Sequence, residues 1–295
     1  MAKELVFKGV GTALITPINE NGVDYKALEK LIEFQIEGGV NALVIAGTTG
    51  EAATLNDEEH KKLLKTSKEI IGNRIPMIAG TGSNDTSYAI DLSKYACEIG
   101  ADALLVVTPY YNKTTQDGLV KSYTEIAKAS SKPIIIYNVP SRTGVNVEPE
   151  TYAKLAEISN INGIKEANGN LAKIMDAFNL VGDKLNIYSG NDDEITPFLS
   201  MGGMGIISVL SNMLPKETVA ICDKFFEGDV KGSRDLQLKY LPLVRALFSE
   251  VNPIPIKSAM AKMGYCENYL RLPLTTMNKA KEEKMFDIMK GLGIK

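Results

Sequence analysis

Short apolar runs alternate with longer amphipathic runs over most of the chain. The apolar runs are rich in Val, Ile, Leu and Ala and show no polar residue at every second position, which is typical of strands buried on both faces. They predict strands at 11–15, 42–46, 77–79, 103–107, 134–137, 163–165, 185–188 and 205–209. Strands of this kind, separated by helices, indicate a parallel sheet.

The amphipathic runs between these strands have the spacing of helices. In the first of them, Leu28, Leu31, Ile32 and Ile36 fall on one helical face. The predicted helices cover 25–36, 57–71, 88–99, 118–129, 150–158 and 171–181. Repeated strand–helix units, eight in all, fit an α/β fold, the parallel (β/α)8 TIM barrel, whose usual length is about 250 residues.

The end of the chain has a different pattern. Leu236, Leu243, Leu247 and the run 277–289 have helical spacing, and the prolines at 253 and 255 are expected to break the chain between them. We therefore assign 1–226 to a barrel that carries the active site and 227–295 to a C-terminal helical appendage.

A doubly wound open sheet is the alternative fold. Its dinucleotide-binding form needs a third glycine after the first two, and the segment 80–85 reads Gly-Thr-Gly-Ser-Asn-Asp without one. Asn84 or Asp85 is better interpreted as the N-cap of the following helix.

The composition narrows the range of possible functions. The 295 residues include 33 basic and 36 acidic side chains, interleaved along the chain, for a net charge of −3. This argues against a nucleic-acid tract or a polybasic membrane surface and favours small-molecule substrates. No apolar run approaches the roughly 20 residues that span a bilayer, and the first residues lack a secretory pattern. We expect a cytoplasmic protein.

The cysteines and the single histidine argue against a structural metal or a disulfide framework. Cys97, Cys222 and Cys266 are odd in number and widely spaced, so we expect free thiols. His60 alone cannot complete a Cys/His metal site.

Candidate chemistry follows from the barrel, because barrel enzymes place their active sites at the C-terminal ends of the strands. Polar residues gather there at 48–51, 108–112 and 137–144, and Lys165 ends the sixth strand. Each has a simpler interpretation: a capped helix start for 48–51, a packing or interface feature for the tyrosine pair at 110–111, a solvated cation for Arg142, and a lysine held by Glu166.

Lys165 is a candidate nucleophile. A free lysine amine has a pKa near 10.4, so about one in 2,500 is neutral at pH 7. Burial between apolar barrel walls that lowers the pKa by ~3 units, worth roughly 4 kcal/mol, gives an amine that attacks carbonyl carbon and forms an imine. Imine chemistry needs a proton carrier, and Tyr137 with nearby threonine hydroxyls is the available relay.

These residues carry a resemblance that covers nearly the whole chain. The chain resembles the dihydrodipicolinate synthase family of the lysine-dependent pyruvate aldolases. The segments that carry the likeness are Gly47–Glu51, Gly80–Asn84, Thr108–Lys113, Tyr137–Gly144, Gly163–Ala167, Ser189–Asp192 and Asn252–Lys257.

The resemblance implies a lyase of L-lysine biosynthesis. In such an enzyme pyruvate condenses with Lys165, tautomerises to an enamine and attacks L-aspartate 4-semialdehyde, after which cyclisation releases the lysine. No metal or organic cofactor is implied. The product is 4-hydroxy-tetrahydrodipicolinate, in the first committed step of the diaminopimelate route.

The resemblance also implies a role for each site residue. Tyr137 would transfer protons, with Thr49 linking it to Tyr111, and Thr48 would bind the pyruvyl carboxylate. Arg142 would hold the semialdehyde carboxylate, a task that suits its forked, permanently charged guanidinium. Backbone contacts near pyruvate would come from Gly190 and Ile207.

Assembly is a further implication. In this family the tyrosine that matches Tyr111 reaches the active site of a neighbouring subunit, so a dimer would be the smallest complete unit. We expect a homotetramer built as a pair of such dimers.

Many family members are inhibited by L-lysine, which binds in a cleft at the dimer interface. The matching positions here are Asn84, Tyr110, Ala53, His60, Asp57 and Tyr88. In the lysine-sensitive bacterial pattern the last two are a histidine and a glutamate, and the glutamate carboxylate pairs with the ligand's ammonium. Tyr88 offers a neutral phenol instead. Asp57 either restores the carboxylate or is a helix-capping acid, and we expect weak or absent inhibition.

Three alternatives remain. A sister aldolase, acting on N-acetylneuraminate or a keto-deoxy-sugar acid, would share Lys165 and Tyr137, but Arg142 argues against it because those lyases generally lack an arginine there. A noncatalytic pyruvate-binding homologue would be expected to have lost one of the relay residues. A metal-dependent aldolase is disfavoured because the acids at 192–194 have no histidine partner and suit the start of a helix.

Overall fold

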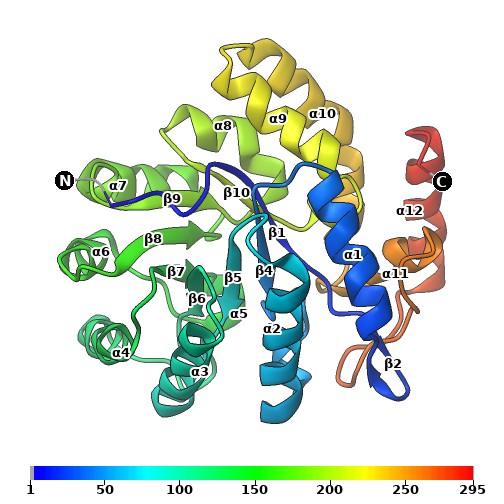
Figure 1. The fold of residues 1–295 in the computed structure, drawn as a ribbon. Helices are drawn as coiled ribbons and strands as arrows, with labels where there is room; N and C mark the ends of the chain where they lie inside the picture. Colours follow the sequence, from blue (N-terminus) through cyan, green and yellow to red (C-terminus); the bar gives the residue numbers. More distant parts are fainter. Residues whose placement is uncertain (1–2, 295) are drawn as a thin grey trace.

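The computed structural model describes residues 3–294 and contains a closed barrel of eight parallel strands (Figure 1). The order around the barrel is β1-β10-β9-β8-β7-β6-β5-β4, and β4 pairs with β1 to close it. The strands are β1 (Gly9–Ala13), β4 (Ala42–Ile45), β5 (Met77–Gly80), β6 (Ala103–Val107), β7 (Ile134–Asn138), β8 (Ile161–Glu166), β9 (Asn186–Ser189) and β10 (Gly205–Ser208). The predicted barrel is confirmed, and the open sheet is ruled out.

Helices surround the barrel. They are α1 (Tyr25–Glu37), α2 (Asp57–Ile71), α3 (Thr86–Glu98), α4 (Gln116–Ala129), α6 (Pro149–Ala156), α7 (Leu171–Val181), α8 (Ile195–Ser200) and α9 (Pro215–Phe226). The bounds of α2 and α7 are those predicted. Asp85 is the N-cap of α3, as proposed, because its carboxylate accepts a hydrogen bond from the amide of Ser87.

Several short elements were not predicted. They are the hairpin of β2 (Ile18–Asn19) and β3 (Gly22–Val23), the one-turn helix α5 (Pro140–Thr143), and the 3-10 turns η1 (Ala52–Thr54), η2 (Asp192–Glu194) and η3 (Leu210–Asn212). Elements this short carry too few residues to show a period. The turns η1 and η2 and the helix α5 nevertheless lie in the loops that follow the strand ends that carry the candidate site.

The core has two apolar layers. One lies between barrel and helices, and the other fills the barrel interior. Phe7, just before β1, closes the barrel end at which the strands begin: its ring stacks on Tyr188 at 4.3 Å, and the Tyr188 hydroxyl donates to its carbonyl at 2.8 Å. At Gly205 φ is +148° and a Cβ would lie 1.9 Å from the Gly9 carbonyl oxygen, so β1 and β10 can approach only because this residue is a glycine.

The C-terminal helices α10 (Val230–Leu247), α11 (Ile254–Lys262) and α12 (Lys279–Gly291) follow the barrel and are drawn in yellow, orange and red in Figure 1. The expectation that prolines break the chain at 253–255 was wrong in part, because Pro253 is the N-cap of α11 and Pro255 lies in its first turn. First-turn amides have no partner inside the helix, so a proline there costs no hydrogen bond.

The predicted boundary at residue 226 coincides with the last residue of α9. The division into a barrel of residues 1–226 and an appendage of residues 227–295 stays a prediction. None of the helices described between residues 3 and 294 has the length and apolar character needed to cross a bilayer.

Candidate active site

Lys165 and Tyr137 lie side by side because β7 and β8 pair in register. Tyr137 is the register partner of Lys165, and both side chains occupy the C-terminal ends of their strands. The Lys165 Nζ lies 4.2 Å from the centre of the Tyr137 ring. The structure therefore brings together the two residues that sequence analysis proposed as nucleophile and proton carrier.

Lys165 is buried without an ionic partner. Its side chain is 6% exposed, and within residues 3–294 no carboxylate lies within salt-bridge distance of Nζ. Glu166 does not hold it, because successive strand residues point to opposite faces. The Glu166 carboxylate accepts hydrogen bonds from Asn138 Nδ2 at 3.0 Å and the Tyr152 hydroxyl at 2.9 Å, outside the barrel interior. The simpler interpretation of Lys165 as a lysine paired with Glu166 is ruled out.

The basicity of Lys165 follows from this burial. Desolvation lowers the pKa of Lys165 to about 7; the negative charge of Asp192 raises this pKa and the positive charge of Arg142 lowers it, both to a smaller extent. About half of the amines are then neutral at pH 7, compared with about one in 2,500 for a free lysine. The amine is available as a nucleophile near neutral pH.

Asp192 was not assigned a role in the site by sequence analysis beyond the start of a helix, which η2 confirms. Its buried carboxylate accepts hydrogen bonds from Ser208 Oγ at 2.5 Å, Val209 N at 2.9 Å and Leu210 N at 3.0 Å. These bonds fix the loop after β10 and place a negative charge near Lys165. No local sequence pattern could have revealed it, because the donors are 16 to 18 residues away.

Gly190 lies beside the lysine, and the backbone contacts proposed for Gly190 and Ile207 stay a prediction. A Cβ on Gly190 would lie 2.7 Å from the Ala167 Cβ and 3.2 Å from the Lys165 Cε, so the glycine leaves room for the lysine side chain. Ile207, on β10, is fully buried in the apolar barrel interior with Tyr137.

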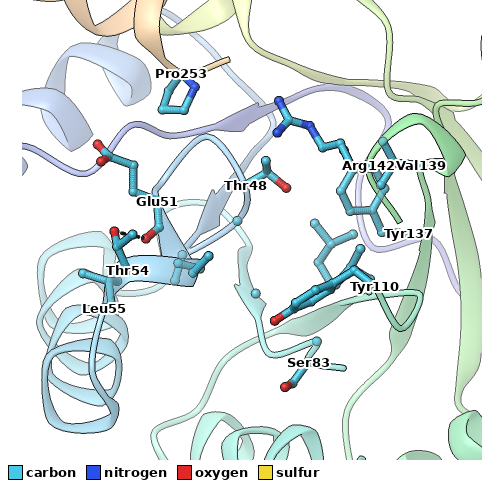
Figure 2. Close-up of a pocket in the computed structure, with 18 of the residues that line it drawn as sticks. Thr48, Glu51, Thr54, Leu55, Ser83, Tyr110, Tyr137, Val139, Arg142 and Pro253 are labelled. Atoms are coloured by element: carbon cyan, nitrogen blue, oxygen red, sulfur yellow. Dashed lines mark hydrogen bonds between the residues drawn. The ribbon is translucent and has the colours of Figure 1, made fainter. Parts of the chain in front are cut away.

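A cavity of 410 Å³ opens over the C-terminal ends of β4–β7. Thr48, Tyr137 and Arg142 line it, and Figure 2 shows their side chains gathered around one part of the cavity, with Tyr110 and Ser83 around another. Burial raises the pKa of Tyr137, while the Arg142 charge and a hydrogen bond with the Thr48 hydroxyl lower it. A substrate in this cavity would meet a phenol, a hydroxyl and a guanidinium.

The C-terminal segment 252–257 contacts the loop that follows β4 and the loop that follows β7. The main-chain oxygen of Asn252 accepts a hydrogen bond from Arg142 Nη2 at 2.9 Å. The side-chain Nδ2 of Asn252 donates to Thr49 Oγ1 at 3.0 Å. Lys257, fully buried on α11, forms an ion pair with buried Glu51, two residues after Thr49. The segment 252–257 carries part of the family resemblance, but its sequence predicted no role for these residues.

Tyr111 lies outside this site. Its side chain is 91% exposed and its backbone has φ of +70°, a left-handed conformation that is uncommon for a bulky residue. Within a single chain Tyr111 therefore does not complete the hydroxyl relay.

Of the six residues proposed to bind inhibitory L-lysine, only some lie around one cavity. Ala53, His60, Tyr88 and Tyr110 line the same 410 Å³ cavity, whereas Asn84 and Asp57 are not among its lining residues. The His60 ring is fixed by a 2.9 Å hydrogen bond between Nε2 and the Gly80 carbonyl oxygen. Burial lowers the pKa of His60, so its neutral form is favoured.

Asp57 is engaged elsewhere. Its carboxylate accepts a 2.8 Å bond from Lys61, one turn further along α2, and this bond is the main reason that the pKa of Asp57 is lowered. Asp57 also forms a hydrogen bond with the Tyr88 hydroxyl, and burial together with this charge raises the pKa of Tyr88. These contacts fit an acid at the start of a helix better than a carboxylate that is free to bind the ammonium of a ligand.

Fold and site define a (β/α)8 barrel protein with a buried, weakly basic lysine beside a tyrosine. In the described part of the chain, residues 3–294, no group of three or more His, Cys, Asp or Glu side chains is arranged to hold a metal ion.

The comparisons with known proteins agree with this class. The sequence profile of the Dihydrodipicolinate synthetase family matches residues 6–292. The 4-hydroxy-tetrahydrodipicolinate synthase of Alkaliphilus oremlandii is 49% identical over 289 residues, which cover 98% of this chain and 100% of the relative. The chain therefore belongs to the dihydrodipicolinate synthetase family.

Two solved structures show the same fold. The chloride-inhibited dihydrodipicolinate synthase of Acinetobacter baumannii in complex with pyruvate is 42% identical, with a TM-score of 0.96 and coverage of 99% of this chain and 100% of that chain. A dihydrodipicolinate synthase variant described as monomeric is 44% identical, with a TM-score of 0.96 and coverage of 98% of both chains.

The two buried lysines should affect stability in opposite ways. The unpaired Lys165 must lose its proton or be buried charged, so Lys165→Met should raise the free energy of unfolding. A pKa of about 7 in the folded protein and 10.5 in the unfolded one makes the gain about 4 kcal/mol at pH 7 and about 2 kcal/mol at pH 9. The gain shrinks as pH rises because the unfolded amine then loses its proton as well. Urea unfolding at both pH values measures the difference.

The matched control is Lys257→Met. It leaves the Glu51 carboxylate buried without its partner and should lower the free energy of unfolding by about 3–5 kcal/mol. A destabilised Lys165→Met protein, or a gain that does not depend on pH, would contradict the assignment of Lys165 as the unpaired, weakly basic amine.

Proposed function

We propose that this chain acts as a 4-hydroxy-tetrahydrodipicolinate synthase, a lyase of L-lysine biosynthesis that condenses pyruvate with L-aspartate 4-semialdehyde. The observation that carries the proposal is the unpaired Lys165 amine, whose pKa is lowered to about 7 beside Tyr137. Family membership supports the substrates. The free thiols of Cys97, Cys222 and Cys266 fit a reducing compartment such as the cytoplasm.

The reaction begins with the neutral amine of Lys165, which attacks the C2 carbonyl of pyruvate and, with loss of water, forms an imine. Tyr137 carries protons to the departing hydroxyl and from C3, and the imine becomes an enamine. The enamine C3 then bonds to the aldehyde carbon of the semialdehyde. Finally, the semialdehyde amine attacks C2 and displaces Lys165, which closes the ring and returns the free enzyme.

Two groups at the cavity account for substrate binding. Thr48 offers its hydroxyl and neighbouring backbone to the pyruvyl carboxylate, next to its contact with Tyr137. Arg142 is exposed at the mouth, and its guanidinium is anchored on the Asn252 carbonyl, with further donors left to bind the semialdehyde carboxylate.

Assembly extends the proposal. The family resemblance assigns to Thr49 the link between Tyr137 and Tyr111 of a neighbouring subunit, whereas the hydroxyl bonded to Tyr137 within this chain is that of Thr48. The exposed, left-handed Tyr111 suits a side chain that inserts into a partner. A dimer is then the smallest unit with complete relays, and a homotetramer is a pair of such dimers. Pyruvate and L-aspartate 4-semialdehyde are the substrates, and neither a metal nor an organic cofactor takes part.

The first prediction concerns the imine. Treatment of the protein with pyruvate and borohydride should attach a reduced pyruvyl group to the peptide that contains Lys165, because this amine is buried without an ionic partner and about half of it is neutral at pH 7. Mass spectrometry of the digest locates the adduct, and Lys165→Met should show none. An adduct on a different lysine, or no adduct in the wild type, would remove the basis of the mechanism.

The second prediction concerns Arg142. Arg142→Ala should leave imine formation with pyruvate intact and lower kcat/KM for L-aspartate 4-semialdehyde by about tenfold to a hundredfold, because a charge-assisted contact worth ~1.5–3 kcal/mol is lost. Arg74→Ala, which removes an arginine paired with Glu33 on the outer surface, is the control and should change neither. Turnover of N-acetylneuraminate by the wild type at an equal rate would favour the sister aldolase instead.

The third prediction concerns regulation. L-lysine should inhibit weakly or not at all, because Tyr88 is neutral and Asp57 is already bound to Lys61. The absent charge contact lowers the affinity by about tenfold or more. Steady-state assays with added L-lysine measure it, and Tyr88→Glu should strengthen inhibition. Micromolar inhibition of the wild type that Asp57→Ala abolishes would show that Asp57 binds the ligand's ammonium.

A further inference from the structure

We infer that Lys257 is a positioning residue that, through its ion pair with Glu51, fixes the hydroxyl of Thr48 in the active site. The inference rests on the proposed function, in which this hydroxyl binds the pyruvyl carboxylate. Lys257 lies on α11, and its side chain is fully buried. A lysine is almost never fully buried unless it is paired, so the place of its partner indicates what it does.

The first contact joins Lys257 to the side chain of Glu51. The Lys257 Nζ donates to Glu51 Oε1, and the exposed fractions of the two side chains are 0% and 1%. The other carboxylate oxygen of Glu51 accepts a hydrogen bond from the main-chain amide of Arg271 at 3.3 Å. Solvent and salt screen a buried pair much less than an exposed one, so the Glu51 carboxylate is held at one place.

The second contact joins the main chain of Glu51 to Thr48. The Glu51 amide donates to the Thr48 carbonyl oxygen at 3.1 Å, and the Gly50 amide donates to the Gly47 carbonyl oxygen at 3.1 Å. Bonds of this spacing close tight turns in the loop that follows β4. Glu51 and Thr48 therefore belong to one short folded loop, and a fixed Glu51 limits where Thr48 can lie.

The backbone of this loop is strained at both ends. Ala46 has φ of +55° and Glu51 has φ of +57°, in the left-handed region that is uncommon for residues other than glycine. Such a conformation costs free energy and persists only where the surrounding contacts hold it. The ion pair with Lys257 acts on one of these two residues, so we expect the loop to relax when the pair is removed.

The third contact reaches the proton carrier of the proposed reaction. The hydroxyl of Thr48 forms a hydrogen bond with Tyr137, whose ring centre lies 4.2 Å from Lys165 Nζ. Glu51, Thr48 and Tyr137 line the same cavity, and Figure 2 shows Thr48 between the other two. A continuous series of contacts thus begins at Lys257 and ends beside the reactive amine.

A purely structural role of the ion pair is the alternative. A pair this deeply buried destabilises the fold when it is broken, wherever it lies. Its loss would then lower the amount of folded protein, but the protein that still folds would bind pyruvate as before. A positioning role predicts the reverse, namely folded protein in which every site still reacts but needs more pyruvate to do so.

The experiment removes the pair without leaving a buried charge alone. The test variant combines Glu51→Gln with Lys257→Met, which nearly keeps the lengths of both side chains and removes both charges. The control combines Asp102→Asn with Lys68→Met, the same kind of change in a partly buried pair at the ends where β5 and β6 begin. The initial rate of pyruvate trapping by borohydride is measured against pyruvate concentration, and mass spectrometry gives the fraction of sites trapped at saturation.

The test variant should trap pyruvate at as many sites as the wild type, but its half-saturating pyruvate concentration should rise about tenfold or more. The reason is that a hydroxyl without a fixed place no longer forms its hydrogen bond to the charged carboxylate. In a Thr48→Val background the same substitutions should raise the half-saturating concentration less than about threefold, because they act through the hydroxyl that is then absent. The control should keep the wild-type concentration.

Glu51→Asp is a second variant, needed where the test variant does not fold. It keeps the charge and shortens the side chain by one methylene, so the ion pair can form only if the loop moves. We expect its half-saturating pyruvate concentration to rise as well.

Three results would overturn the inference. These are a wild-type half-saturating concentration in the folded test variant or in Glu51→Asp, an equal rise in the control, and a full further rise in the Thr48→Val background. A wild type that traps no pyruvate would refute the proposed function and the inference with it, whereas normal trapping in the wild type with any of the three results refutes the inference alone.

Discussion

The structure of this site depends on one costly arrangement, a lysine amine buried in an apolar barrel with no carboxylate to pair with. Water would keep the amine charged, and the barrel interior favours the neutral form because a low-dielectric surrounding cannot solvate the charge. The same chain contains the opposite case at Lys257, where burial is equally complete but Glu51 pairs with the amine. Lys165 is thus available for chemistry, whereas Lys257 stabilises the fold.

The surrounding elements can be understood from this arrangement. The alternation of side chains along β8 sends Lys165 into the barrel and Glu166 to the outside, where Asn138 and Tyr152 satisfy its carboxylate. Gly190 leaves space for the lysine side chain, and the negative charge of Asp192 limits how far the pKa of Lys165 falls. The C-terminal segment 252–257 then bonds to the loops that follow β4 and β7 and holds them together.

Sequence analysis recovered most of the barrel because its signals are local. The strand β6 and the helices α2 and α7 have their predicted bounds, and Lys165 was found from its position at a strand end. The start of α11 at Ile254, directly after Pro253, was missed because a proline is equally consistent with a break and with the start of a helix. The contacts of Asn252 and Lys257 could not be predicted, because their partners lie 203 and 206 residues away.

The central claim is that burial is the main reason why the Lys165 amine is weakly basic. It is tested most directly by an NMR titration of protein that carries ¹³C at the lysine ε-carbons, with Lys165→Met used to assign the signal. The account predicts that the Lys165 signal titrates with a midpoint about pH 7, while exposed lysines titrate near 10.4. A Lys165 midpoint above about 9.5, close to that of a solvated amine, would contradict it.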